Sequence, residues 1–186
     1  MIAKEFDQMK RYGLVRLYGS GCDQVSRTLP HILKNNQKVI LGIYSPQEAI
    51  DQSVKIFKDA LDKHAGGKWN SVILVTVENE KVNSHEMTAS NVVDLIDRAR
   101  KELAGAGYTG SVGAVETVPA LVGNPAICQK SDQALANIHA FFDGKVLPQD
   151  AGKFVQSEIA RLKNACPGKR VVVTESGWPH QGLTND

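Results

Sequence analysis

The chain has 186 residues, which suggests a single domain because domains usually contain about 100–150 residues. Hydrophobic residues make up 42% and charged residues 23% of the sequence, which is typical of a globular protein and excludes disordered and fibrous classes. The net charge of +2 gives no indication of a nucleic acid or an anionic membrane as a partner. No apolar stretch is long enough for a membrane span, and the first residues lack the apolar core of a signal peptide. On length alone, a closed eight-stranded α/β barrel of about 250 residues is excluded.

The first part of the chain predicts two helices and two strands in alternation. Apolar residues at helical spacing over 2–9 predict a helix that ends before Gly13. A second helical pattern covers 25–33, and its main part is expected to begin near Thr28 because Pro30 interrupts it. Runs rich in β-forming residues predict strands at 14–18 and 38–44.

The middle of the chain continues this alternation. Ser45, Pro46 and Glu48 predict a helix start, since serine caps a helix, proline suits the first turn and glutamate completes a capping box. The helix behind this start carries an apolar stripe over 50–61. A strand of the buried type follows at 71–77, and the next amphipathic helix at 92–103 is closed by glycines.

The last part predicts two strands separated by a loop, a helix, and a sixth strand, at 111–118, 134–142, 155–166 and 170–174. Strands that are nearly continuous in apolar residues and alternate with helices indicate a parallel sheet covered on both faces. The fold class is therefore α/β. Ligands of such folds bind beyond the carboxyl ends of the strands, so candidate site residues are sought there.

Carboxylates stand just past two of these strands. Glu78, Asn79 and Glu80 follow the strand at 71–77, and Glu175 follows the strand at 170–174. A single acid at a strand end is more often solvated, or caps the next helix. Two carboxylates that converge on one crevice are what glycosidic bond cleavage requires, because one must donate a proton while the other attacks the anomeric carbon.

Aromatic side chains gather at the same strand ends, namely Tyr18, Tyr44, Phe141, Phe142 and Trp178. Aromatic faces suit the C–H faces of sugar rings as well as protein cores. For Phe141 and Phe142 the two interpretations are equally supported. Trp178, which proline follows in a loop with glycine, is the better candidate for a sugar contact.

Two basic residues also lie on the predicted sheet. Arg16 falls inside an apolar strand, where an arginine needs an acidic partner from the site or from a structural ion pair. His139 lies near a strand end, where a histidine is usually a hydrogen-bonded structural residue but can also tune a neighbouring carboxylate.

The sequence gives no support for a cofactor or a metal. The glycines after the first strand form only a partial dinucleotide fingerprint, because Gln24 occupies the third glycine position. His85-Glu86 lacks the second histidine of a zinc protease. No Cys-x-x-Cys pair occurs, so structural zinc is not expected. The odd cysteine count allows one bridge and one free thiol without requiring a bridge. The three cysteines are Cys22, Cys128 and Cys166.

Four segments together resemble a known family, and the resemblance covers nearly the whole chain. They are VRLYG with CDQV within 15–25, VENE at 77–80, NIHAFF at 137–142 and VTESGWP at 173–179. These segments are similar to the β-1,3-glucanases of glycoside hydrolase family 17, and among them to the fungal cell-wall branch, which includes glucanosyltransferases. The resemblance implies a (β/α)8 TIM-type barrel and a retaining mechanism on β-1,3-glucan.

The resemblance also implies roles for individual residues. Glu80 is the expected acid/base, Glu175 the nucleophile, and Asn79 a hydrogen-bond partner of the sugar 2-hydroxyl. The family usually has glycine before the Asn-Glu pair. Here the residue is Glu78, which either perturbs Glu80 or points away along the strand. With Asn79, the expected substrate-binding residues are Arg16, Tyr18, Tyr44, His139, Phe141 and Trp178.

Several expectations about the whole protein follow from the same resemblance. It implies secretion to the cell wall. In that setting it also implies a disulfide between Cys128 and Cys166, with Cys22 outside this bridge. Hydrolysis and glucanosyl transfer use the same catalytic residues, so both activities stay open. A non-catalytic glucan-binding wall protein and an inactive fragment are the further alternatives, and the oligomeric state is not predicted.

The barrel expectation changes the interpretation of the length. Six strands over 186 residues give about 31 residues for each strand and its connection, so eight would need about 250 residues. The length then fits an incomplete barrel, with strands two to seven present and both ends truncated. We therefore expect residues 1–186 to form a single, partial (β/α) barrel catalytic domain.

Overall fold

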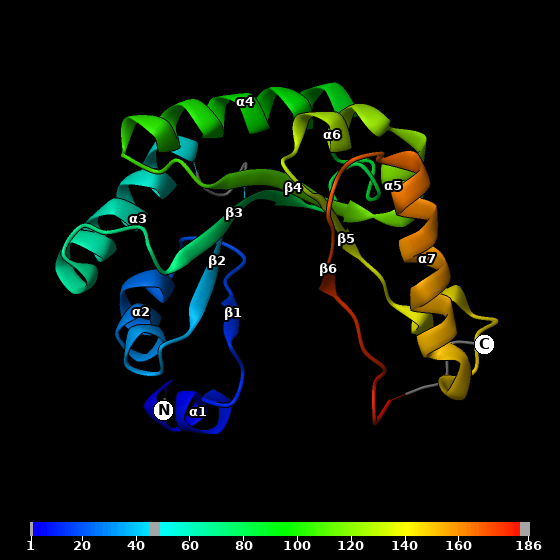
Figure 1. Cartoon of the computed structure of the whole chain (residues 1–186), viewed down its shortest axis with the longest axis horizontal. Helices are drawn as coiled ribbons and strands as arrows, with labels where there is room; N and C mark the ends of the chain where they lie inside the picture. Colours follow the sequence, from blue (N-terminus) through cyan, green and yellow to red (C-terminus); the bar gives the residue numbers. More distant parts are fainter. Residues whose placement is uncertain (1, 45–48, 183–186) are drawn as a thin grey trace. The chain divides into compact units, whose positions relative to one another are not determined.

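The structure is a computed structural model that describes residues 2–44 and 49–182 (Figure 1). The helix start predicted at 45–48 lies outside the described residues. The chain forms two compact units, here called unit 1 (residues 1–79 and 94–112) and unit 2 (residues 80–93 and 113–186). Among the helices in the described ranges, none is both long and apolar enough to cross a bilayer. The expectation of a single domain stays a prediction.

Unit 1 contains three parallel strands with helical connections. Its elements are α1 (Ile2–Met9), β1 (Leu14–Arg16), α2 (Gln24–Lys34), β2 (Lys38–Ile43), α3 (Ile50–Ala65), β3 (Val72–Asn79) and most of α4 (Ala89–Gly105). Strand β2 pairs with β1 on one side, where Val15 faces Val39, and with β3 on the other, where Leu41 faces Val75. The predicted alternation of strands and helices is confirmed in this part.

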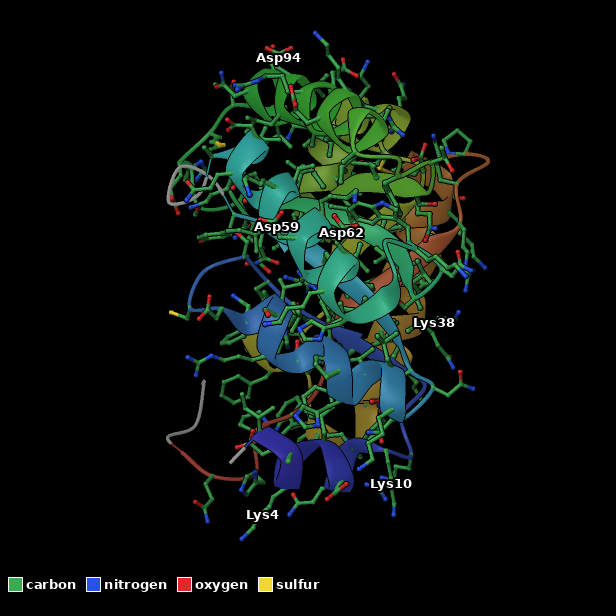
Figure 2. All side chains as sticks on the ribbon, turned by 90° about the vertical axis from the view of Figure 1, so that its left-hand side faces the viewer. Lys4, Lys10, Lys38, Asp59, Asp62 and Asp94 are labelled. Carbon is green, nitrogen blue, oxygen red and sulfur yellow. A yellow bond between two sulfur atoms is a disulfide. The ribbon has the colours of Figure 1, made fainter. Side chains whose placement is uncertain are left out.

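Burial follows the position of each strand in unit 1. The β2 and β3 strands are almost entirely buried, as their continuous apolar sequences indicated, whereas β1 is exposed or half-buried. Helices α2 and α3 bury their apolar stripes, including Leu29, Ile32 and Phe57. Their outward faces are charged, and Figure 2 shows Asp59 and Asp62 of α3, each of which pairs with a lysine one turn earlier.

Helix α2 begins earlier than predicted. It starts at Gln24 rather than near Thr28, and Pro30 lies inside it. A proline inside a helix costs about 3 kcal/mol because it removes one main-chain hydrogen bond. Here the helix buries Val25, Leu29 and Ile32 on one face, and this apolar burial over three turns outweighs the lost bond.

One glycine in unit 1 is required by close packing. A Cβ atom on Gly42 of β2 would lie 2.3 Å from the carbonyl oxygen of Tyr18 and 2.7 Å from that of Leu17. Both contacts are to main-chain atoms, which cannot rotate away. The glycine therefore lets the segment after β1 run directly against β2, and this close approach fixes the position of Tyr18.

Unit 2 contains the other three strands. Its elements after the start of α4 are most of β4 (Ser111–Thr117), α5 (Val118–Gly123), α6 (Pro125–Lys130), β5 (Ala134–Asn137), the 3₁₀ turns η1 (Ala140–Asp143) and η2 (Pro148–Asp150), α7 (Ala151–Ala165) and β6 (Val171–Glu175). Strand β5 is parallel to β4 and to β6, and its last residue, Asn137, faces Thr117 on one side and Glu175 on the other.

Two predictions in this part are wrong. The region expected to be a loop between 118 and 134 forms α5 and α6, each of which has a proline in its first turn. The strand expected at 134–142 ends at Asn137. The amide of Ile138 still bonds to the carbonyl of Glu175, but the amide of Phe142 bonds to the carbonyl of His139, which turns the chain into η1.

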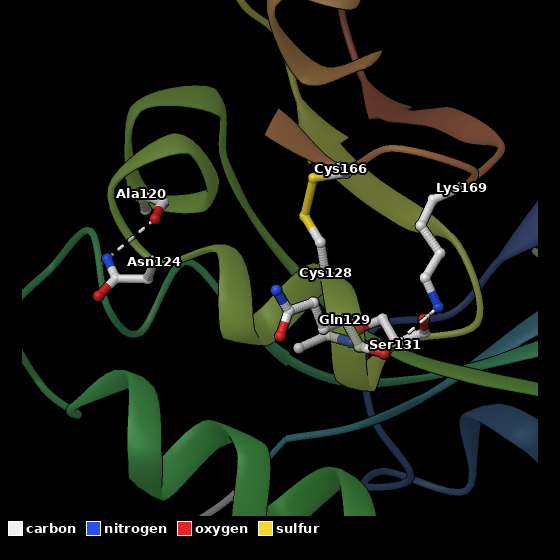
Figure 3. Close-up of a disulfide and its surroundings, with 8 residues drawn as sticks. Ala120, Asn124, Cys128, Gln129, Ser131, Cys166 and Lys169 are labelled. Carbon is white, nitrogen blue, oxygen red and sulfur yellow. Dashed lines mark hydrogen bonds between the residues drawn. A yellow bond between two sulfur atoms is a disulfide. The ribbon is translucent and has the colours of Figure 1, made fainter. Parts of the chain in front are cut away.

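A disulfide joins two helices of unit 2 (Figure 3). Cys128 of α6 and Cys166, which caps α7, form the bond, and both residues are buried. The pairing implied by the resemblance is confirmed, and Cys22 is free and exposed. Next to the bond, the ammonium group of Lys169 donates to the carbonyls of Ser131 and Gln129 at the end of α6. The segment that leads into β6 is therefore fastened to α6 at two points.

Candidate active site

The backbone at the end of β3 has an uncommon conformation. Glu78 and Glu80 have φ angles of 63° and 56°, in the left-handed region that side chains other than glycine rarely adopt. The carboxyl-bearing side chain of Glu78 is buried within β3, whereas the amide of Glu80 donates to the carbonyl of Val115 in β4. Non-glycine residues in this conformation cluster at functional sites, where the surrounding structure holds them in place.

In unit 2, Asn137 connects the carboxylate of Glu80 to strand β6. Its side-chain amide donates to Oε1 of Glu80 at 2.7 Å. The hydroxyl of Thr174, in β6, donates to the side-chain carbonyl of Asn137 at 2.7 Å. Because the side-chain oxygen of Asn137 accepts from Thr174, the side-chain nitrogen of Asn137 is directed at Glu80. Glu175 follows Thr174 and pairs with Asn137 in the β5–β6 register.

The sequence reasoning missed Asn137. The residue was noted only as part of the NIHAFF segment, and its signal was available: it is a polar residue at the carboxyl end of a buried strand, the same criterion that selected Glu80 and Glu175. Its side chain is almost completely buried, so its hydrogen bonds replace contacts with water.

Glu175 has a histidine partner. Nε2 of His139 lies 3.2 Å from Oε2 of Glu175, and both side chains are about three-quarters buried, with 27% and 22% exposed. An ionised carboxylate only accepts hydrogen bonds, so His139 donates to Glu175 when that glutamate is charged. The structure therefore brings these two predicted site residues into hydrogen-bond contact.

An open aromatic pocket lies beside this pair. It has a volume of about 370 Å³ and is lined by His139, Phe141, Phe142 and residues 176–179. Phe141 packs edge-on against Trp178 at 5.4 Å and against Phe142 at 5.3 Å. Phe142 is 72% exposed and Trp178 is 36% exposed. The exposure of the Phe142 ring argues against core packing, and its contact with a sugar stays a prediction.

Unit 1 holds the other predicted substrate-binding residues. Arg16 donates to the side-chain carbonyl of Asn79 at 2.9 Å, and its guanidinium carbon lies 4.2 Å from the centre of the Tyr18 ring. The structure therefore brings together three residues that the sequence analysis selected separately. Tyr44 follows β2 and is half-buried. An acidic partner for Arg16 stays a prediction.

A further carboxyl group, Glu116 at the end of β4, was also missed. It is fully buried, and its oxygens accept from the main-chain amides of Val82 and Asn83 at 2.7 and 3.3 Å. Burial raises the pKa of Glu116, hydrogen bonds from the main-chain amides of Val82, Asn83 and Thr117 oppose that rise, and the negative charge of Glu80 adds to it. Among the described residues, no cluster of three or more His, Cys, Asp or Glu side chains is arranged to hold a metal ion.

Comparisons with known families and proteins identify the kind of chain that carries this arrangement. The model of the BtgE/BtgC glycoside hydrolase domain matches residues 1–186. The chain belongs to this family. It is 41% identical over 184 residues to the probable family 17 glucosidase SCW4 of Saccharomyces cerevisiae, a match that covers 98% of this chain and 47% of that protein. It is also 37% identical over 185 residues to the cell surface mannoprotein MP65 of Candida albicans, covering 99% of this chain and 48% of that protein.

A solved structure shows the fold. An active-site mutant of Rhizomucor miehei β-1,3-glucanosyltransferase in complex with laminaritriose is 20% identical to this chain, with a TM-score of 0.82. The match covers 98% of this chain and 66% of the other. The six strands are thus those of an incomplete (β/α)8 barrel of the glycoside hydrolase family 17 type, which confirms the predicted fold class. The chain spans about half the length of the yeast relatives that it matches.

Proposed function

We propose that this chain is the catalytic part of a retaining glycoside hydrolase that cleaves β-1,3-glucan, with Glu175 as nucleophile and Glu80 as acid/base. The observation that carries the proposal is Asn137, whose side chain binds Glu80 while its main chain pairs with Glu175. Asn137 therefore links the Glu80 carboxylate to the strand that carries Glu175, and two carboxylates at the carboxyl ends of parallel strands form the pair that a double displacement needs. Family membership supports the reaction class.

The first step forms a glycosyl-enzyme. A carboxylate oxygen of Glu175 attacks the anomeric carbon, the bond from that carbon to the leaving oxygen breaks, and Glu80 gives its proton to the leaving oxygen. The attack requires the charged form of Glu175, and His139 donates a hydrogen bond to that form. Because Oε1 of Glu80 accepts from Asn137, the proton of the acid form belongs on Oε2.

The second step regenerates the enzyme. Glu80, now ionised, takes a proton from an incoming hydroxyl, whose oxygen attacks the anomeric carbon and releases Glu175. If water is the acceptor the reaction is hydrolysis, and if a second sugar hydroxyl is the acceptor the reaction is glucanosyl transfer. Transfer is the alternative activity, and the name of the solved relative, β-1,3-glucanosyltransferase, favours it.

The substrate proposal rests on the aromatic pocket. The rings of Phe141, Phe142 and Trp178 provide apolar faces for the C–H faces of glucose units next to Glu175. The solved relative holds laminaritriose. A secreted protein at the cell wall is the setting proposed for this reaction, supported by the relative named as a cell surface mannoprotein.

Product sizing tests the activity and separates the alternatives. The full chain is incubated with β-1,3-glucan oligosaccharides: only shorter products indicate hydrolysis, and additional longer products indicate transfer. Glu175→Gln is expected to reduce turnover at least 10³-fold, while Glu102→Gln, which changes an exposed glutamate of α4, leaves turnover unchanged.

Two results would contradict the proposal. Retained turnover in Glu175→Gln would remove this residue from the nucleophile role. Binding without any product from the wild-type chain would favour the glucan-binding alternative instead. Binding is followed by the fluorescence of Trp178 after Trp69→Phe, since the chain has two tryptophans. Trp69 bonds to Ala106 in unit 1 and does not line the pocket.

A further inference from the structure

The segment that follows Glu80 folds into a compact loop. In residues 80–87, here called the acid/base loop, the carbonyl of Glu80 accepts from the amide of Ser84, and the carbonyl of Lys81 accepts from the amides of Glu86 and Met87. The second half of the loop therefore folds back and bonds to the carbonyls of its first two residues. A rigid loop of this kind fixes the direction in which the side chain of Glu80 leaves the backbone.

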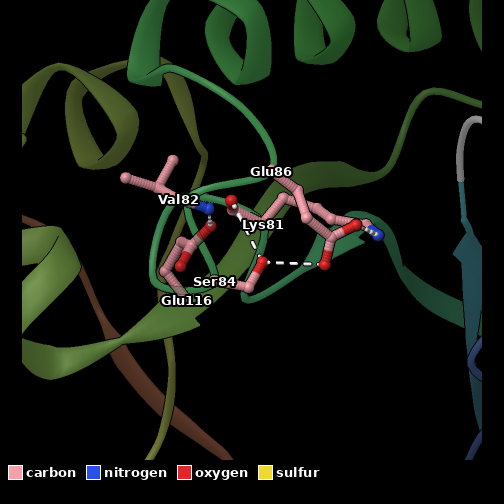
Figure 4. A network of polar contacts seen from close by, with 5 residues as sticks. All are labelled: Lys81, Val82, Ser84, Glu86 and Glu116. Atoms are coloured by element: carbon pink, nitrogen blue, oxygen red, sulfur yellow. Dashed lines mark hydrogen bonds and ion pairs between the residues drawn. The ribbon is translucent and has the colours of Figure 1, made fainter.

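Strand β4 contacts this loop through its last three residues. The carboxylate of Glu116 accepts from the amides of Val82 and Asn83. The hydroxyl of Thr117 donates to the side-chain carbonyl of Asn83 at 2.9 Å. With the bond from the amide of Glu80 to the carbonyl of Val115, three successive residues of β4 contact the loop. Figure 4 shows the carboxylate of Glu116 beneath the amide of Val82.

An ion pair closes the other side of the loop. Lys81, only 1% exposed, places its ammonium group on Oε2 of Glu86, and the hydroxyl of Ser84 donates to Oε1 of the same residue. Hydrogen bonds from Lys81 and Ser84 hold the pKa of Glu86 below its usual value. Glu86 therefore stays charged and keeps Lys81 paired at the pH of most assays.

The burial of the Glu116 carboxyl group has a free-energy cost that an apolar residue at this position would not have. A buried carboxyl group is destabilising unless it is well hydrogen-bonded, and an apolar residue at the end of β4 would avoid the cost. Only a carboxylate of this length offers two acceptor oxygens to two neighbouring amides. The cost is therefore tied to the position of the loop and not to the core of unit 2.

We infer that Glu116 is a positioning residue for Glu80, which acts by clamping the main chain of the acid/base loop so that the Glu80 carboxyl group keeps its geometry for proton transfer. The inference rests on the proposed function for the role of Glu80. It extends that function by naming a residue that touches neither the substrate nor Glu175 in the proposed mechanism.

This role predicts a defect that depends on the leaving group. Proton donation matters when the leaving oxygen belongs to a sugar, and matters little when it belongs to a strongly acidic phenol. Glu116→Gln keeps the size of the side chain but replaces one acceptor oxygen with an amide group, which cannot accept from Asn83. The variant is expected to lose at least 10-fold more kcat on laminaritriose than on 2,4-dinitrophenyl β-glucoside.

Glu158→Gln is the matched control. Glu158 is also a buried glutamate, but its partner is Arg161 on α7, outside the acid/base loop. The control is expected to affect both substrates equally. An equal loss on both substrates in Glu116→Gln, or no loss on either, would overturn the inference.

Hydrogen exchange tests the clamp without using turnover. In Glu116→Gln the amides of Val82, Asn83 and Glu80 are expected to exchange at least 10-fold faster, while the amide of Leu135 in β5 keeps its rate. An unchanged rate at Glu80 would overturn the clamp even if the variant is less active. If the wild-type chain has no activity on either substrate, the proposed function fails, whereas the exchange rates still decide whether Glu116 holds Glu80.

Discussion

The disulfide between Cys128 and Cys166 allows a quantitative prediction for this chain. The two residues are 38 positions apart in the sequence, and the bond fastens α6 to the turn between α7 and β6. Closing a loop of that length removes conformational entropy from the unfolded chain, which corresponds to about 4 kcal/mol at 25 °C. We therefore expect Cys128→Ala/Cys166→Ala to lower the free energy of unfolding by about 3–4 kcal/mol.

Urea denaturation followed by circular dichroism measures this loss. For a chain of this size, a loss of about 3–4 kcal/mol lowers Tm by roughly 6–16 °C. The unfolded double variant is not crosslinked and exposes more surface, so its m-value is expected to rise. Reduced wild-type protein should behave like the double variant. The control is Cys22→Ala, an exposed free cysteine whose replacement is expected to change stability by less than about 0.5 kcal/mol.

The m-value separates an effect of the disulfide on the unfolded chain from an effect on the folded state. A loss of less than about 1 kcal/mol with an unchanged m-value would refute the entropic explanation. A full loss with an unchanged m-value would place the effect in the folded state, in the buried contacts of the two sulfur atoms.

Three further predictions concern packing, pH and the nucleophile. Gly42→Ala is expected to lower the free energy of unfolding by about 1–3 kcal/mol because its Cβ would collide with the main chain of Tyr18. Gly13→Ala, with no atom within 4 Å of its Cβ, should show no such loss by urea denaturation. Because burial raises the pKa of Glu116, the stability from this group is complete below its usual pKa of 4.5 and is lost as the pH rises through the folded-state pKa. The difference in urea midpoint between wild type and Glu116→Gln should therefore fall from about pH 4 to pH 7, and a constant difference would contradict the assignment. A 2-deoxy-2-fluoro β-glucosyl fluoride should label Glu175, as found by peptide mass spectrometry, and a label on Glu80 would reverse the proposed roles.

The strands were predictable because burial on both faces leaves a direct record in the sequence. β2 to β5 appear as runs of apolar residues, and β3 to β6 lead directly to polar residues that lie at the carboxyl ends. The helices α5 and α6 were not predicted because each has only six residues and too few turns for a periodic pattern.

The hydrogen-bond partners in the candidate site were less predictable. Asn137 lies 57 residues from Glu80, and Glu116 lies 34 residues from Val82. Periodicity shows which face of a strand is buried, but it does not show which distant residue a buried polar group meets. Both residues were visible as polar groups at strand ends, a pattern that turn residues share.

The hydrogen bonds from Thr174 through Asn137 to Glu80 run in one direction. An amide side chain can rotate by half a turn and exchange its oxygen and nitrogen, and the hydrogen bond from the hydroxyl of Thr174 opposes this rotation for Asn137. Without that hydroxyl, the amide oxygen is free to turn toward Glu80, where it would repel the carboxylate and accept a hydrogen bond from the acid form. Thr174 therefore influences the orientation of a hydrogen bond to Glu80 from 94 positions away in the sequence, and natural replacements of Thr174 and Asn137 are expected to occur together.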